Sequence, residues 1–196
     1  MQKITVRKLT VTAMLSAVAA VLMMLQIKLP FMPSFISFDV SDLPPLLASF
    51  ALGPVWGVIV CLLKNVLHAF SSSTGGVGEL SNFIISGMFV FVAGMIYKHK
   101  KTRMGAIISS VIGAAASAVV CVFTNYYIIY PLFGLIGWKS EIILGLYQAI
   151  LPWVSNMWQA LAIFNLPFTF VKGLCCALLA FAIYKPLSPV LKGKKQ

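Results

Sequence analysis

Long runs of apolar residues separated by short polar segments set the pattern of the chain. The first run, residues 9–27, holds 19 nearly uninterrupted apolar or small residues. A helix needs about 20 such residues to cross the hydrocarbon core of a bilayer. Similar runs follow at 43–70, about 80–97, 104–132 and about 157–184. This pattern predicts an all-α, polytopic membrane protein.

The second run is too long for one ordinary span and carries Gly53-Pro54 near its middle. Proline lacks a backbone donor and disfavours helix in the residue before it. The run is therefore either one kinked helix or a hairpin of two short helices. The basic segments 1–8 and 98–103 both belong in the cytoplasm by the positive-inside rule. An even number of crossings must then separate them, which favours the hairpin.

The sequence therefore predicts six transmembrane helices, with the N-terminus and the basic C-terminal tail both in the cytoplasm. The expected spans are 9–27, 42–53, 54–71, 79–97, 104–132 and 157–184, and a short helix is expected in the outer loop before the last span. Residues 1–196 are expected to form a single transmembrane domain in the plasma membrane.

Composition supports the membrane assignment and narrows the function. The chain is 60% apolar and 10% charged, with a formal net charge of +11. The basic residues cluster at the chain ends and in one loop, which is typical of membrane orientation and argues against nucleic-acid binding. The four cysteines, all within apolar runs, are interpreted as small buried hydrophobes.

Residues 38–83 hold an unusual density of polar groups for such a chain. Three of its four acids, Asp39, Asp42 and Glu79, lie there, and Lys64 falls inside an apolar run. Ionisable groups within a membrane are costly and are usually kept for function. For Lys64 a structural role and a functional one stay open, whereas Lys172, deep in the last span, favours a functional role.

The glycine-rich segment 74–78 is interpreted as a tight turn rather than a phosphate-binding loop, because no Gly-Lys-Ser/Thr follows it. The turn is expected to direct Glu79 and Asn82, three residues apart on one helix face, into a pocket. For Asn125 and Asn165 a purely structural role, in which the amides only hold helices together, stays open at this point. His68 is interpreted as structural.

Catalysis finds no support in these residues. The sequence has no Ser-His-Asp grouping, no His-Glu-x-x-His segment and no histidine or cysteine set at metal spacing. We expect no catalytic residues, no metal site and no cofactor.

Two segments resemble a known family. FMPSFISFDVSDLPPLLASFALGPVWGVIVCLLKNVLH, residues 31–68, and STGGVGELSNF, residues 73–83, are similar to the riboflavin-specific substrate-binding subunits, or S components, of energy-coupling-factor (ECF) vitamin transporters. FNLPFTFVKG, residues 164–173, and the small-residue pattern Ala13-x-x-x-Ala17 extend the resemblance over the whole chain.

The resemblance implies a subunit that binds riboflavin from outside as a transported ligand. It also implies a membrane coupling subunit, docked on the Ala13 and Ala17 face, and two cytoplasmic ATPases. The chain itself has no Walker motif, which agrees with ATP hydrolysis by partners. The alternatives are an S component for a different vitamin and a non-transport membrane scaffold subunit.

The family's binding groups and the polar and aromatic pattern together predict the ligand-binding residues. An isoalloxazine ring needs apolar walls and a polar edge, and the ribityl chain needs hydrogen-bonding groups. At Thr169 a hydroxyl stands where family members often carry asparagine. The predicted riboflavin-binding set is Phe38, Asp39, Glu79, Asn82, Asn125, Tyr126, Thr169 and Lys172.

Overall fold

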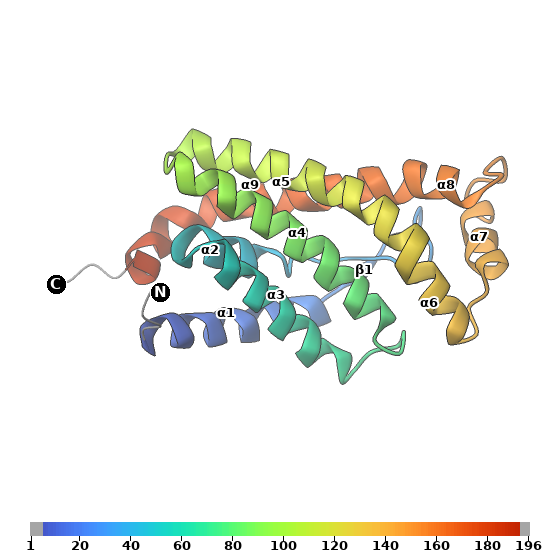
Figure 1. The fold of residues 1–196 in the computed structure, drawn as a ribbon, viewed down its shortest axis with the longest axis horizontal. Coiled ribbons are helices and arrows are strands. Elements are labelled where there is room, and N and C mark those ends of the chain that lie inside the picture. The colour runs from blue at the N-terminus through green and yellow to red at the C-terminus, as the bar shows by residue number, and fades with distance from the viewer. Residues whose placement is uncertain (1–5, 193–196) are drawn as a thin grey trace.

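The computed structural model describes residues 6–192, with side-chain surroundings through residue 183. Helices make up nearly all of its regular structure (Figure 1). The elements are α1 (Val6–Met24), β1 (Ile27–Lys28), β2 (Ser37–Phe38), α2 (Leu43–Leu52), α3 (Pro54–Ala69), α4 (Val77–His99), α5 (Arg103–Thr124), the π-helical turn η1 (Asn125–Ile129), α6 (Tyr130–Leu135), α7 (Ser140–Gln148), α8 (Met157–Ala160), the π-helical turn η2 (Leu161–Asn165) and α9 (Leu166–Lys192).

Four helical segments are long and apolar enough to cross a membrane: Val6–Met24, Val77–His99, Arg103–Leu135 and Met157–Ile183. The all-α membrane class is therefore confirmed. The helices lie on the predicted apolar runs, with ends shifted by a few residues. Which of the shorter helices also cross the membrane stays a prediction.

The break at Gly53-Pro54 is a hairpin between α2 and α3. Gly53 has φ +116°, a conformation that glycine adopts readily. Beyond the turn, Gly57 lies against α2, where an added Cβ would be 2.6 Å from Ser49 Cβ and 2.9 Å from the Pro45 carbonyl oxygen. This close approach brings the two short helices together side by side, as the charge argument predicted.

Two features of the backbone were not predicted. The segment before α2 contains a short antiparallel pair, in which Ile27 faces Phe38 and Lys28 faces Ser37. The two π-helical turns were also missed, and each ends two residues before a proline, Pro131 or Pro167. Because proline lacks an N–H and its ring crowds the carbonyl four residues earlier, the preceding turn widens.

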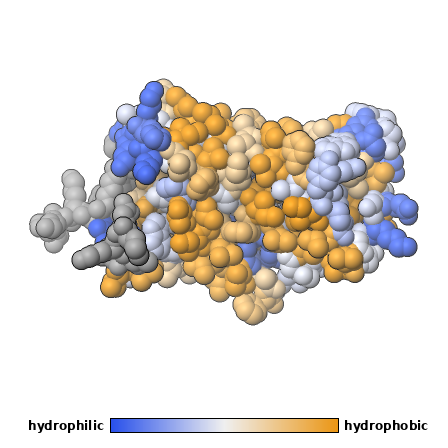
Figure 2. Space-filling model, viewed as in Figure 1, coloured by the Kyte–Doolittle hydropathy of each residue, from blue (hydrophilic) through white to orange (hydrophobic). Residues whose placement is uncertain are grey.

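Different helices and helix ends lie at the two ends of the long axis of the molecule. The start of α1, the end of α9 and the α4–α5 turn lie at one end, and α6, α7 and α8 lie at the other (Figure 1). Between them the visible surface is a broad apolar band, with hydrophilic residues gathered towards both ends (Figure 2). Parts of the predicted basic segments, residues 1–5 and 193–196, lie outside the described residues.

Candidate ligand cavity

A cavity of about 150 Å³ lies where α4, α5, η1 and the last helical segment face the residues that precede α2. Its apolar lining is largely aromatic and includes Phe35, Phe89, Phe133 and Phe168. Its polar lining is supplied chiefly by Asp42, Asn82, Asn125, Asn165, Thr169 and Lys172. Apolar walls with a few placed polar groups are typical of small-molecule sites.

Both π-helical turns contribute an asparagine to this cavity. Asn125 is the first residue of η1 and Asn165 is the last residue of η2, and both side chains are buried. A π-helical turn inserts one extra residue into a helix and is frequent at functional sites. The turns therefore shift the side-chain register at the two places where amides meet the cavity.

The orientation of the Asn125 amide is set by two neighbours. Its Oδ1 accepts a hydrogen bond from Ser81 Oγ of α4 at 3.0 Å, and its Nδ2 donates to Cys121 Sγ at 3.2 Å. Thr169 Oγ1, from α9, donates to the same sulfur at 3.3 Å. Asn125 and Thr169 thus approach one another from different helices at one wall.

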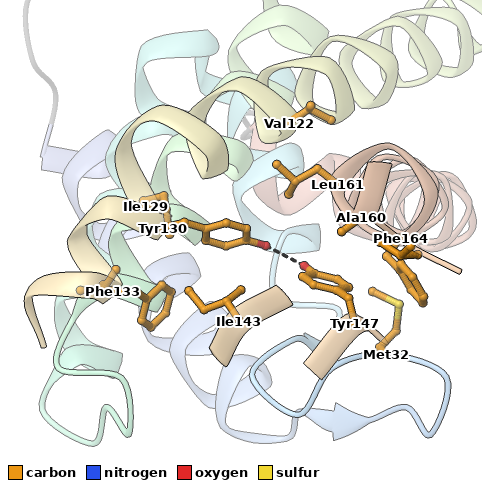
Figure 3. Close-up of a cluster of buried hydrophobic side chains, with 12 residues drawn as sticks. Met32, Val122, Ile129, Tyr130, Phe133, Ile143, Tyr147, Ala160, Leu161 and Phe164 are labelled. Carbon is orange, nitrogen blue, oxygen red and sulfur yellow. Dashed lines mark hydrogen bonds between the residues drawn. The ribbon is translucent and has the colours of Figure 1, made fainter. Parts of the chain in front are cut away.

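Asn165 belongs to a closed network with two tyrosines. Tyr130 and Tyr147 join their hydroxyls at 2.6 Å, Tyr147 donates to Asn165 Oδ1, and Asn165 Nδ2 donates to Tyr130 Oη at 3.3 Å. Figure 3 shows the two tyrosines meeting within the buried apolar cluster that joins α6, α7 and η2. This network ties α7 to the cavity wall.

Phe35 fastens the segment before α2 to the same cluster. Its ring contacts those of Tyr130, Tyr147 and Trp138, with centroid separations of 6.3, 5.9 and 6.3 Å. Such edge-to-face contacts stabilise a fold by more than the burial of their apolar surface alone. Residues 35–37 are thereby held against the cavity.

Four buried charges form a second polar centre, which we call the charge cluster: Asp39, Asp42, Lys64 and Lys172. Lys64 Nζ bonds Asp42 and donates to Ser41 Oγ at 2.8 Å, and Lys172 Nζ lies 2.9 Å from Asp39 Oδ2 and 3.8 Å from Asp42 Oδ2. Ser86 Oγ also donates to Asp42, at 2.6 Å. Two carboxylates thus balance two ammonium groups inside the protein.

Asp39 lies between α1 and α2 and is ionised in this cluster. Burial alone would raise the pKa of its carboxyl, but the ammonium groups of Lys172 and Lys64 together outweigh burial and hold the pKa below its usual value. The interpretation of Lys172 changes accordingly. Its ammonium already has carboxylate partners, so a ligand is not needed to neutralise it.

Glu79 accepts hydrogen bonds from the segment around the glycine-rich turn and does not line the cavity. Its carboxylate meets His68 Nδ1 at 2.8 Å and accepts from Ser72 Oγ at 2.7 Å. Gly75 and Gly76 have positive φ, +60° and +86°, so the segment is the predicted turn. Of the pair expected to point into the pocket, only Asn82 lines it.

The other predicted binding residues lie around the cavity and not in its lining. Phe38 lines a separate apolar groove. Its ring lies 6.3 Å, centroid to centroid, from that of Phe168, which lines both the groove and the cavity. Tyr126 stacks on Trp158 with ring centroids 4.3 Å apart. Of the eight predicted residues, four line the cavity: Asn82, Asn125, Thr169 and Lys172.

Sequence reasoning left Asp42, Tyr130 and Asn165 outside the binding set, although all three line the cavity. For Asn165 a signal was available, since it lies within an apolar span two residues before Pro167. The partnership of Tyr130 with Tyr147 has no local signal, because the residues meet only through the fold.

Helix α1 presents two faces. Thr12, Ser16 and Ala19 are buried against the rest of the protein, whereas Ala13 and Ala17 are exposed. The predicted docking face is therefore accessible.

Long apolar helices around a cavity with polar and aromatic lining are typical of a polytopic membrane protein that binds a small molecule. Comparison with known proteins narrows this class. The family model for the substrate-specific component of ECF transporters matches residues 7–184, and the chain belongs to this family.

Relatives and a solved structure agree with this assignment. The chain is 33% identical to the riboflavin transporter RibU of Staphylococcus aureus, over 95% of this chain and 93% of the relative. It is 30% identical to the riboflavin transporter FmnP of Bacillus subtilis, over 97% and 96% of the two chains. A structure titled "Structure and mechanism of the S component of a bacterial ECF transporter" superposes with a TM-score of 0.73 at 32% identity, covering 94% of this chain and 97% of that one.

The expected family is thereby confirmed. The chain is a transporter subunit rather than an enzyme, and it is a multi-pass protein of the plasma membrane.

Proposed function

We propose that this chain is the riboflavin-binding subunit of an ECF transporter and that the ligand occupies the cavity lined by Asn125 and Lys172. The observation that carries this proposal is that Asn125, Thr169 and Lys172, from two helical segments, all line a cavity whose apolar lining is largely aromatic. Two relatives that match nearly the whole chain bear the name riboflavin transporter.

The chemistry of riboflavin suits this arrangement. Its isoalloxazine ring is flat and largely apolar, and carbonyl and ring-nitrogen acceptors lie along one edge. Phe35 and Phe168 supply aromatic surface, while the amide of Asn125, the hydroxyl of Thr169 and the ammonium of Lys172 supply donors. Asn82 and Asp42 are suited to the hydroxyls of the ribityl chain.

In this proposal the remaining predicted residues support the site without contacting the ligand. Asp39 fixes the position of Lys172 through their ion pair. Glu79 maintains the turn that precedes Asn82. Phe38 and Tyr126 pack at the borders of the site.

The flavin absorbance of the detergent-purified protein tests this function. A yellow protein with bound flavin supports it. A colourless protein that takes up no added riboflavin but binds another vitamin points to an S component of different specificity. A folded protein that binds no added vitamin contradicts the proposal.

The proposal includes six spans with both termini in the cytoplasm. Helices α2 and α3 have 10 and 16 residues. At about 1.5 Å per residue they reach only about 15 and 24 Å, against a hydrocarbon core of about 30 Å. Their flanking residues therefore share the crossing, beside the cavity and the charge cluster. Short helices next to a cavity are common at transporter binding sites.

Cysteine labelling of whole cells tests this topology. Ser73 is exposed in the α3–α4 connection and Lys100 is exposed in the basic α4–α5 turn. We expect an impermeant thiol reagent to label Ser73→Cys from outside and to label Lys100→Cys only after the membrane is opened. The parent chain is the control for its own cysteines. Labelling of position 100 in intact cells would contradict the six-span arrangement.

A membrane coupling subunit and two ATPases complete the proposed transporter, with docking on the exposed Ala13 and Ala17 face. Small residues let helices approach closely, and bulky ones keep them apart. We expect Ala13→Trp and Ala17→Trp to leave riboflavin binding intact and to abolish uptake in cells that carry the partner subunits.

The matched control for this prediction is Val18→Trp, which enlarges another exposed residue of α1. Normal uptake by both alanine variants would show that the coupling subunit docks elsewhere.

A further inference from the structure

Cys121 lies at the cavity wall, one turn before η1 on α5, and is 2% exposed. Its sulfur receives two hydrogen bonds, from Asn125 Nδ2 at 3.2 Å and from Thr169 Oγ1 at 3.3 Å. Both donor side chains line the cavity as well. Two donors from different helices thus point at one atom beside the proposed ligand.

A thiol sulfur is a weak acceptor, whereas carbonyl oxygens and ring nitrogens are strong ones. The Asn125 amide cannot simply turn to offer its oxygen, because Oδ1 accepts from Ser81 on α4 at 3.0 Å. The two donors are therefore oriented but only weakly bonded by the sulfur. A buried donor without any acceptor is costly, so by accepting from both donors the sulfur also keeps them from turning to other acceptors.

We propose that Cys121 is a positioning residue that holds the donors of Asn125 and Thr169 ready and releases them to the stronger acceptors of the ligand's polar edge. The inference rests on the proposed function and specifies it further. The ligand is recognised here through acceptor atoms along one edge of a planar ring. The alternative to this positioning role is that Cys121 is only a small buried apolar residue.

Two substitutions of nearly the same size separate these alternatives. Cys121→Ser introduces a hydroxyl that can donate to the Ser117 carbonyl, one turn back, and turn a strong acceptor towards Asn125 and Thr169. The donors are then held more tightly, and we expect riboflavin to bind about threefold to tenfold more weakly. Cys121→Ala removes the acceptor, so binding should stay equal to the parent or tighten by up to about threefold.

Purified parent and variant proteins are titrated with riboflavin while quenching of flavin fluorescence is followed. Cys176→Ser is the matched control, because Cys176 is fully buried on α9 and is not part of the cavity lining. It should bind like the parent. The effect of Cys121→Ser should shrink when Thr169→Val removes one of the two donors, which a general packing defect would not do.

Each outcome separates this inference from the proposed function. A folded parent that does not bind riboflavin overturns both. A parent that binds, with Cys121→Ser equal to it or with both Cys121 variants weakened alike, overturns only the role of Cys121. If the serine variant does not fold, a loss of more than threefold in Cys121→Ala still overturns that role.

Discussion

Replacing Lys64 by methionine should lower the free energy of unfolding by about 3–5 kcal/mol. Lys64 is completely buried, bonds Asp42 and donates to Ser41. Its loss leaves two carboxylates facing one ammonium inside the protein, and removing one partner of a buried ion pair carries a cost of about this size. Chemical denaturation in detergent measures the change.

A charge-balanced variant is the control for this prediction. In Lys64→Met combined with Asp42→Asn, the pair Asp39–Lys172 remains and the buried charge again sums to zero. This double variant should recover most of the lost stability. If Lys64→Met alone is as stable as the parent, or if the double variant is less stable than the single one, the ion pairs of the charge cluster do not stabilise the fold.

Removing donors from the cavity wall should weaken riboflavin binding by at least roughly tenfold. Asn125→Ala removes a buried amide from the wall, and loss of one partner in a buried polar contact costs about 1–3 kcal/mol. About 1.4 kcal/mol corresponds to a tenfold change in the dissociation constant. The ammonium of Lys172 is tested in the double variant Asp39→Asn with Lys172→Met, which keeps the buried charge balanced against Asp42 and Lys64.

The titration of purified protein with riboflavin measures both effects. Thr124→Val is the matched control, since Thr124 precedes Asn125, bonds only backbone carbonyls of its own helix and does not line the cavity. It should bind like the parent. Parent-like affinity in folded Asn125→Ala and in the folded double variant would place the ligand elsewhere.

The helices could be predicted because the membrane imposes a simple rule on the sequence. Backbone polar groups must be satisfied within each span, so long apolar runs become helices. Even the α2–α3 hairpin followed from Gly53-Pro54 and the count of crossings between basic segments. The paired strands β1 and β2 could not be predicted, because their four residues carry no alternation and pair across two prolines.

The site was only partly predictable. Asn82, Asn125, Thr169 and Lys172 line the cavity, and each is a polar residue in an apolar run, where its cost signals a role. Glu79 lies outside the cavity lining, because spacing along a helix predicts a shared face but not which partners a side chain meets. Its carboxylate turns to His68 and to the serine of the preceding turn instead.

The pairing of charges was beyond the sequence for the same reason. Lys64 and Asp42 are 22 residues apart, and Lys172 and Asp39 are 133 apart. Local patterns show that each charge is unusual, but only the packing of α3 and α9 against the start of α2 shows which charges neutralise one another. The π-helical turns had a local signal in the two prolines, which indicates a distortion without its type.

The most direct test of the proposed site is a crystal structure of this protein grown with riboflavin. We expect electron density for the isoalloxazine ring in the cavity between Asn125 and Lys172, with its polar edge at those two side chains and its face against Phe168. Density in the apolar groove lined by Phe31 and Phe38, or a cavity without ligand density in crystals grown with saturating riboflavin, would contradict the proposal.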